Sequence, residues 1–261
     1  MSSFLVSPVT ASMADGPLIV VVAQQASAVR VTRRHRHARG QLLGATHGLL
    51  SIDAGNSQWV VPATHAVWIP PDVSHGLRSH GPFAGWSVYV TESACADLPG
   101  APCILAASGL LREAVTRAAG WSDDALDVAQ SRLAGVILDE IRTLPHEALG
   151  LPMPRDARLL KIARALSERP ADERRLEEWA EWAAIAPRTL TRRFMAETGF
   201  SFTAWRQRVR LLRALELLAA GKPVTAIALD LGYDNVSAFI ALFKKFFGVT
   251  PGQYFTHDPG Q

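Results

Sequence analysis

The chain has 261 residues, of which 48% are hydrophobic and 20% are charged, and its formal net charge is +3. This length suits two domains that each bury a core, and this composition excludes a disordered or fibrous protein. The 2 cysteines exclude a disulfide framework and a zinc knuckle.

Targeting and membrane signals are absent from the sequence. No run approaches the roughly 20 apolar residues of a membrane span, and residues 1–16 lack the basic and apolar regions of a signal peptide. We therefore expect a cytoplasmic protein without a membrane partner.

The two halves of the chain differ in the sign of their charge. Up to Pro154 there are 10 Lys and Arg against 12 Asp and Glu, and after it there are 17 against 12, which gives net charges of −2 and +5. A basic C-terminal half suits a polyanion, a membrane surface or an acidic protein, and charge alone does not choose among them.

The N-terminal part shows short apolar runs separated by turn residues. Residues 53–56 and 70–72 supply two of the turn signals. This pattern predicts an all-β domain over residues 1–106, a sandwich or small barrel. The predicted strands contain the runs Leu18–Val22, Leu42–Leu43, Leu49–Ile52, Trp59–Val61, Ala66–Ile69 and Trp86–Val90.

A helical period follows over residues 107–150, which we predict to be a helical segment for dimerisation or linkage. Leu133, Ile137, Ile141 and Leu144 recur at spacings of four, four and three and so lie along one helix face. This face suits packing on the β domain, and it equally suits pairing with a second protomer. A homodimer is therefore a hypothesis.

The segment Leu149–Pro154 holds two prolines and a glycine, and we place the domain boundary there. The domain at 155–256 contains one helix-turn-helix pattern twice, at about 173–197 and 221–247. Pro187 suits the first turn of one second helix, and Asn235 suits the N-cap of the other. The helix 202–219 between the patterns would be roughly 27 Å long, near the ~34 Å separation of successive major grooves.

Several spaced motifs resemble the AraC/XylS family of transcription regulators over about residues 155–255. They are Arg188–Phe194 with Glu197–Gly199, Leu231–Tyr233, Ser237–Phe239, Phe243–Gly248 and Thr250–Tyr254. The resemblance implies an all-α domain that reads double-stranded DNA as part of a transcription regulator and is not an enzyme.

The resemblance also implies which residues contact DNA. Base contacts would come from Arg188, Thr191 and Arg192 in the first unit and from Val236, Ser237 and Ala241 in the second. Phosphate contacts would come from Arg193, Arg206, Asn235 and Lys244. For any one arginine, a solvated surface charge is the alternative. Because the second helix offers few hydrogen-bonding side chains, we expect the first unit to supply most of the sequence discrimination.

A histidine pattern in the β domain is similar to the two motifs of cupin barrels. It consists of His35 and His37, which would share one face of a strand, the later Gln41, and His75 after a proline-containing turn. The resemblance implies a cupin-like sensor barrel, and these four residues could hold a divalent ion such as zinc, nickel or iron. A solvated basic strand is the alternative.

A pocket for an organic effector, lined by Trp59, Trp68 and Trp86, is the sensor site that we favour over a metal ion. The function predicted from the sequence is therefore control of a promoter by a small-molecule effector, with RNA polymerase as a further candidate partner. The rival is a metal-dependent cupin enzyme with a helical appendage. The sequence leaves open the effector, the promoter, and activation against repression.

Overall fold

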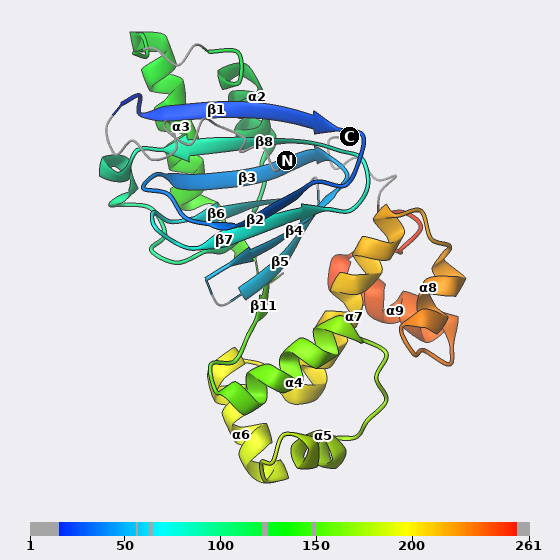
Figure 1. The fold of residues 1–261 in the computed structure, drawn as a ribbon. Helices are drawn as coiled ribbons and strands as arrows, with labels where there is room; N and C mark the ends of the chain where they lie inside the picture. Colours follow the sequence, from blue (N-terminus) through cyan, green and yellow to red (C-terminus); the bar gives the residue numbers. More distant parts are fainter. Residues whose placement is uncertain (1–15, 56, 63–64, 122–124, 148–149, 255–261) are drawn as a thin grey trace. The chain divides into compact units, whose positions relative to one another are not determined.

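A computed structural model describes residues 16–55, 57–62, 65–121, 125–147 and 150–254 (Figure 1). These residues form two compact units that divide between Gly150 and Leu151. The N-terminal unit is built on β-strands and the C-terminal unit is helical, as the sequence predicts.

Two antiparallel sheets face each other in the N-terminal unit. The strand order is β1-β8-β3-β6-β9-β10 in one sheet and β11-β5-β4-β7-β2 in the other. The strands are β1 Ile19–Ala26, β2 Val31–His35, β3 Gly40–His47, β4 Leu49–Ala54, β5 Ser57–Pro62, β6 His65–Ile69, β7 His75–Ser79, β8 Phe83–Val90, β9 Cys103–Ala106, β10 His146–Glu147 and β11 Gly150–Pro152.

Every apolar run predicted as a strand overlaps one, whereas β2, β7, β9, β10 and β11 were not predicted as strands, and β10 lies in the segment 107–150 that was predicted to be helical. β2 has the sequence Val-Thr-Arg-Arg-His, which is too polar for a periodicity signal, and it is mostly exposed. His35 is its last residue, so the prediction that His35 and His37 share a strand is wrong. His37 lies in the connection between β2 and β3.

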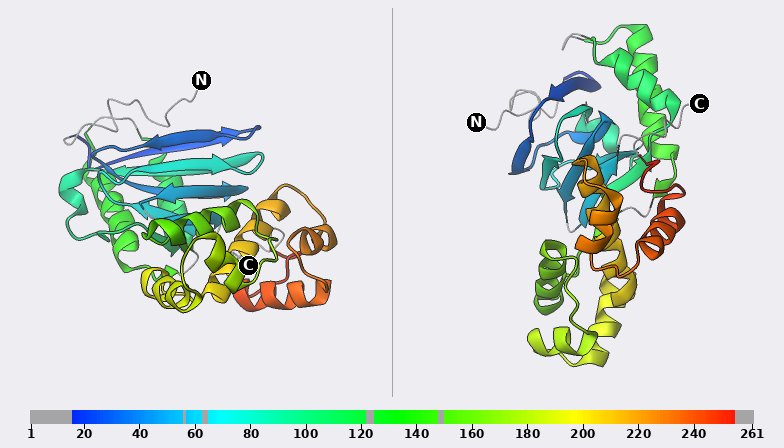
Figure 2. Two further views of the ribbon diagram at one scale, coloured as in Figure 1. Left: turned by 60° about the horizontal axis from the view of Figure 1, so that its bottom comes forward. Right: turned by 90° about the vertical axis from the view of Figure 1, so that its right-hand side faces the viewer.

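Helices α2 (Gly109–Ala118) and α3 (Val128–Thr143) cover the outer face of the sheet that contains β1, β8 and β3 (Figures 1 and 2). Ile137 and Ile141 of α3 are fully buried in this layer together with Trp68. The apolar face of α3 therefore packs within its own unit, which is the first of the two interpretations above. Homodimerisation stays a prediction.

The C-terminal unit consists of short helices around one long helix. Helix α7 has the bounds predicted from the sequence, whereas α4 was missed although Asp156 caps it and Leu159, Ile162 and Leu166 are buried at helical spacing. None of the helices in the described residues combines the length and apolar character needed to cross a bilayer. The helices are α4 Ala157–Glu168, α5 Leu176–Trp182, α6 Pro187–Thr198, α7 Phe202–Ala219, α8 Val224–Asp230 and α9 Val236–Phe247.

The turns of the two helix-turn-helix units share one backbone conformation. Ala184 follows α5 with φ 51°, and Gly232 follows α8 with φ 74°. In each unit the next residue donates its amide hydrogen back to the preceding helix, from Ile185 to the Ala180 carbonyl at 2.9 Å and from Tyr233 to the Ala228 carbonyl at 3.0 Å. In the first turn, Ala184 therefore has a left-handed backbone conformation that favours glycine, because a Cβ is strained there.

This difference predicts opposite effects of two exchanges on thermal stability. Ala184→Gly removes left-handed backbone strain of roughly 1–2 kcal/mol, but it also increases the conformational entropy of the unfolded chain, which favours unfolding by about 0.4–1 kcal/mol. The unfolding temperature of the C-terminal unit should therefore rise by a few degrees. Gly232→Ala should move it down by a similar amount. Scanning calorimetry of the full chain measures both, and shifts of the same sign would contradict the shared geometry.

Candidate functional site

Helix α6 is the second helix of the first helix-turn-helix unit. Pro187 occupies its first turn, as predicted, and Ala186 at the N-cap makes no side-chain capping bond. The helix is held from one side because Leu190 and Phe194 are fully buried. The Phe194 ring packs edge-on against Phe202 and Trp205 of α7, at centroid distances of 5.3 and 5.4 Å.

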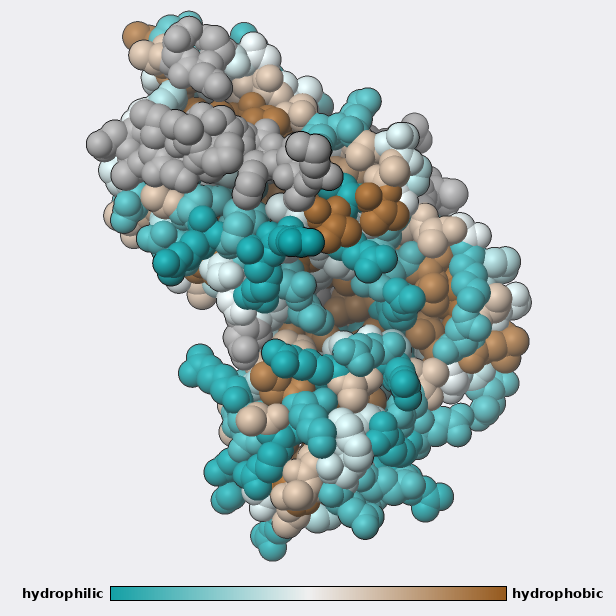
Figure 3. Space-filling view, viewed as in Figure 1, coloured by the Kyte–Doolittle hydropathy of each residue, from teal (hydrophilic) through white to brown (hydrophobic). Residues whose placement is uncertain are grey.

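The opposite side of α6 is exposed to solvent. Arg188, Thr191 and Arg192 all lie there, which brings the three predicted base-reading residues of the first unit onto one surface. The Thr191 hydroxyl donates to the Pro187 carbonyl at 3.1 Å. Two guanidinium groups on one helix face can each fork onto a guanine edge or approach phosphates. Figure 3 shows that the surface around α4, α5 and α6 is largely hydrophilic.

Helix α9 occupies the corresponding place in the second unit. Asn235 caps it, as predicted, because its side-chain oxygen accepts the Ser237 amide hydrogen at 2.7 Å. Phe239 and Phe243 are fully buried and hold the helix.

The outer side of α9 offers small side chains first and cations last. Ser237, Ala241 and Lys244 are exposed there, and Val236 is half-buried. Lys245 is equally exposed and was not named from the sequence, although its place beside Lys244 in the last turn is a readable signal. Apolar side chains at base edges discriminate weakly.

The basic residues of α7 mostly serve the fold. Arg206, predicted to contact phosphate, is half-buried and donates to the Arg174 carbonyl at 3.0 Å and to the Asp172 carbonyl. Arg210 donates to the Pro170 carbonyl at 3.0 Å. We therefore assign the Arg206 guanidinium to the C-terminal unit's own structure and withdraw it as a DNA contact.

Three histidines come together inside the N-terminal unit. One ring nitrogen from each of His35, His37 and His75 lies within 4.8 Å of those from the other two. The ring centroids are 4.3 Å apart for His35 and His75 and 4.9 Å apart for His37 and His75. Strands β2 and β7 create this arrangement by pairing His35 with His75, and the connection to β3 returns His37 to the same place.

Each of these imidazoles has its Nδ1 against a backbone carbonyl. The distances are 2.9 Å from His35 to Arg33, 2.7 Å from His37 to Arg39, and 2.8 Å from His75 to Val73. In a neutral His75 ring, Nδ1–H then donates to the carbonyl and Nε2 keeps its lone pair, which is the orientation of metal-bound histidines, whereas Nε2 of His37 also faces an acceptor, Gln41 Oε1.

Burial supports the neutral form at two of these residues. Desolvation lowers the pKa of His37, and it lowers the pKa of His75 to about 4. His75 Nε2 is buried and has no hydrogen-bond partner among the described residues. A buried unpaired lone pair in a polar cluster calls for a ligand. Three imidazoles suit zinc, nickel or iron.

The side chain of Gln41 lies next to these three histidines, which together with it form the histidine centre. It is 3% exposed, its Oε1 lies 3.2 Å from His37 Nε2, and its Nε2 lies 3.2 Å from Ser87 Oγ. The centre therefore brings together the four residues predicted from the sequence, with a carboxamide that could add an oxygen ligand.

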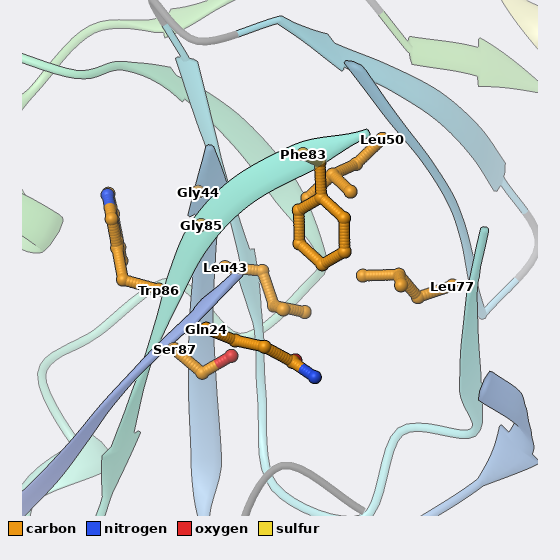
Figure 4. A pocket seen from close by; sticks show the side chains of 9 residues that line it. All are labelled: Gln24, Leu43, Gly44, Leu50, Leu77, Phe83, Gly85, Trp86 and Ser87. Atoms are coloured by element: carbon orange, nitrogen blue, oxygen red, sulfur yellow. The ribbon is translucent and has the colours of Figure 1, made fainter. Parts of the chain in front are cut away.

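Ser87 also borders a small cavity between the sheets. Gln24, Leu43, Leu77, Phe83 and Trp86 are among the residues that line it, and in Figure 4 the indole of Trp86 points away from the converging Leu43, Leu77 and Phe83. The cavity has a volume of ≈ 10 Å³, room for about one water molecule. An organic effector would have to push these side chains apart.

The other predicted effector-binding tryptophans lie elsewhere. Trp68 is fully buried beneath α2 and α3, and its indole N–H donates to the Pro99 carbonyl at 2.8 Å. Trp59 is 6% exposed and lies against Gly150. Neither lines the cavity, so both are core residues rather than an effector pocket. Strand position alone does not reveal on which face of a sheet a tryptophan lies.

Comparison with known proteins covers both units. Residues 17–180 match the family model described as an AraC-like ligand binding domain, and residues 179–257 match a helix-turn-helix domain. The chain is 35% identical over 221 residues to the HTH-type transcriptional regulator NimR of Escherichia coli K12, covering 84% of this chain and 81% of that protein. It is 26% identical over 126 residues to the arabinose operon regulatory protein of the same strain, covering 47% and 43%.

Among solved structures, ToxT from Vibrio cholerae with a bound unsaturated fatty acid is 14% identical, covers 94% of this chain and 96% of that one, and gives a TM-score of 0.40. A likeness this weak supports no inference about the ligand.

The histidine centre generates a prediction about metal binding. We expect the chain to bind Zn²⁺ or Ni²⁺ by titration calorimetry, and His75→Ala to weaken binding by at least about tenfold because it removes one of three imidazoles. The matched control is His47→Ala, since His47 is exposed at the end of β3. Equal affinity in the wild type and His75→Ala would show that the centre is not the metal site.

Proposed function

Because the chain belongs to the AraC-type family of helix-turn-helix transcription regulators, we propose that it controls a promoter by placing α6 and α9 in successive major grooves, in response to a ligand bound in the β unit. The observation that carries the DNA half of the proposal is the exposed face of α6. It presents two guanidinium groups and a hydroxyl from a helix that is anchored by the burial of Leu190 and Phe194.

The two reading helices divide the work in this proposal. Arg188 and Arg192 of α6 supply base discrimination, and Thr191 supports them. On α9, Val236, Ser237 and Ala241 meet thymine methyl groups and sugar edges, while Asn235 and Lys244 bind phosphate. A good bidentate arginine contact discriminates by roughly 1–3 kcal/mol, and a phosphate contact adds affinity without sequence information.

The helix between the units supports this spacing. The 18 residues of α7 make a rod of roughly 27 Å, and it lies between the two helix-turn-helix units in Figure 1. Successive major grooves on one side of B-DNA are ~34 Å apart. One chain would therefore cover two adjacent grooves, and a homodimer would double the site. RNA polymerase is the further partner that we propose for such a regulator.

Of the two candidate ligand sites in the β unit, the histidine centre is better formed than the cavity beside Ser87. Ligand pockets usually offer about 300–1,000 Å³, which the small cavity beside Ser87 does not. The histidines, in contrast, already converge with their Nδ1 atoms fixed. We therefore place a divalent metal ion ahead of a purely organic effector, which reverses the order favoured from the sequence. A bound ion would draw the three rings together and hold β2 against β7.

Selection from a pool of random duplexes at moderate salt tests the DNA half. We expect enrichment of a bipartite site whose two elements lie about one helical turn apart. The Arg192→Ala variant should lose preference at one position of the first element, because its side chain reads that base pair. The Lys244→Ala variant should keep the preference and bind all sequences more weakly.

Uniform loss of binding in Arg192→Ala, without a change in the selected sequence, would contradict the assignment of base reading to α6. No enrichment by the wild type at any salt concentration would overturn the DNA half of the proposal altogether.

Measuring DNA affinity with and without metal tests the input half. We expect Zn²⁺ or Ni²⁺ to change the affinity of the wild type for its selected site by about 5–150-fold, the usual range of coupling between sites. His75→Ala should keep the metal-free affinity and lose the response, and His47→Ala should keep both. A metal response that survives in His75→Ala would place the input elsewhere.

A further inference from the structure

A polar joint fastens α6 to the segment through which the chain enters the C-terminal unit. Glu197, near the end of α6, accepts the backbone amide hydrogens of Arg155 at 2.6 Å and Asp156 at 2.9 Å. Arg193, one turn earlier, forms an ion pair of 2.5 Å with the Asp156 carboxylate. Two side chains of α6 thus grip the same short stretch of backbone.

Asp156 is itself held in place. Its carboxylate caps α4 by accepting the amide hydrogens of Arg158 and Leu159, at 2.9 and 3.4 Å. The hydrogen bond from the Arg158 side chain is the largest cause that lowers the pKa of Asp156, to about 2. The side chain is 13% exposed, so its charge is largely enclosed by these donors.

The adjoining residues are anchored as well. Leu151 and Met153 are buried, and the Trp205 indole N–H of α7 donates to the Pro152 carbonyl at 2.8 Å. The segment 151–156 is therefore bonded to α4, α6 and α7 together.

Together with the burial of Leu190 and Phe194, the joint fixes how α6 is rotated about its axis. Residues 193 and 197 are four apart and lie on one side of the helix, whereas residue 192 points about 100° away. As long as Arg193 and Glu197 hold residues 155 and 156, Arg188 and Arg192 face outwards. A rotation by one residue would bring Arg193 to the reading side in place of Arg192.

From this geometry we propose that Asp156, Arg193 and Glu197 are positioning residues, which set the sequence preference of α6 without contacting DNA. Arg193 is thereby reassigned from phosphate contact to positioning. The inference rests on the proposed function, because it presupposes that α6 reads base edges.

Asp156→Asn is the sharpest test of this inference. Asparagine caps a helix as well as aspartate does, so α4 should remain intact while the charge that holds Arg193 is lost. We expect the ratio of affinities for the selected site and for a site altered in its first element to fall about threefold, within the range of partly exposed ion pairs. Thermal unfolding of the variant checks that the fold is retained.

The matched control is Glu216→Gln. It breaks the Arg213–Glu216 pair of α7, which has a distance of 2.6 Å and side-chain exposures of 45% and 18%, against 2.5 Å, 47% and 13% for the pair of Arg193 and Asp156. This control should leave the affinity ratio unchanged.

A salt titration separates positioning from phosphate contact. Log affinity falls as log salt concentration rises, and removing one phosphate contact makes this fall less steep by about 0.9, as we expect for Lys244→Ala. Arg193→Ala should leave the slope unchanged and lower the affinity ratio. A lowered slope in Arg193→Ala, or an unchanged ratio in Asp156→Asn, would overturn the inference. A wild type without any sequence preference would instead remove the proposed function.

Discussion

The burial of Arg208 in α7 is the constraint on which the geometry of the DNA-binding unit depends. Its side chain lies between the rings of Phe200, which follows α6, and Phe246 of α9, at 4.4 and 4.8 Å. The residue is 7% exposed, and burial lowers the pKa of its guanidinium. Arginine nevertheless keeps its charge at neutral pH, and the two aromatic faces offer it favourable cation–π contacts. One cation thus ties both helix-turn-helix units to the helix between them.

The same contacts show how far the helical unit can be predicted from sequence. The spacing of four residues between Leu190 and Phe194, and between Phe239 and Phe243, predicts both second helices and their exposed faces, because local spacing determines which side of a helix is buried. All four residues are fully buried in the structure. The roles of the arginines in α7 are not local. In the sequence, Arg206 and Arg208 are two basic residues of one helix that could both face DNA. In the structure, Arg206 donates to the Arg174 carbonyl and Arg208 lies over the Phe246 ring, partners more than 30 residues away in the chain. Charge pattern alone cannot separate a buried cation from a solvated one.

In the β unit, polar residues were easier to predict than aromatic ones. Histidines and glutamine at the right spacing indicated the centre, although one assumption behind it was wrong, since His37 lies outside β2. The centre forms because strand register places His75 opposite His35, and register is a property of the whole sheet. Trp59 and Trp68, which do not line the cavity, were misassigned for the related reason that a strand has two faces. Trp68 lies on the face that α2 and α3 cover, whereas Gln41 and Ser87 contact each other between the sheets.

These ties restrict how a ligand in the β unit can act on DNA. α6 is fastened to residues 155–156 and to α7, and α9 is fastened to α7 through Arg208. Closely packed elements of this kind switch between discrete arrangements and do not deform gradually. In this structure the spacing of α6 and α9 is therefore set by their contacts with α7 and with residues 155–156. Under the proposed function, a signal would act by placing the whole unit differently on the promoter, and the segment 151–156 is the covalent connection between the two units. Because that segment is hydrogen-bonded to α6, the helix to which we assign most of the base discrimination is also the one tied most directly to the N-terminal unit.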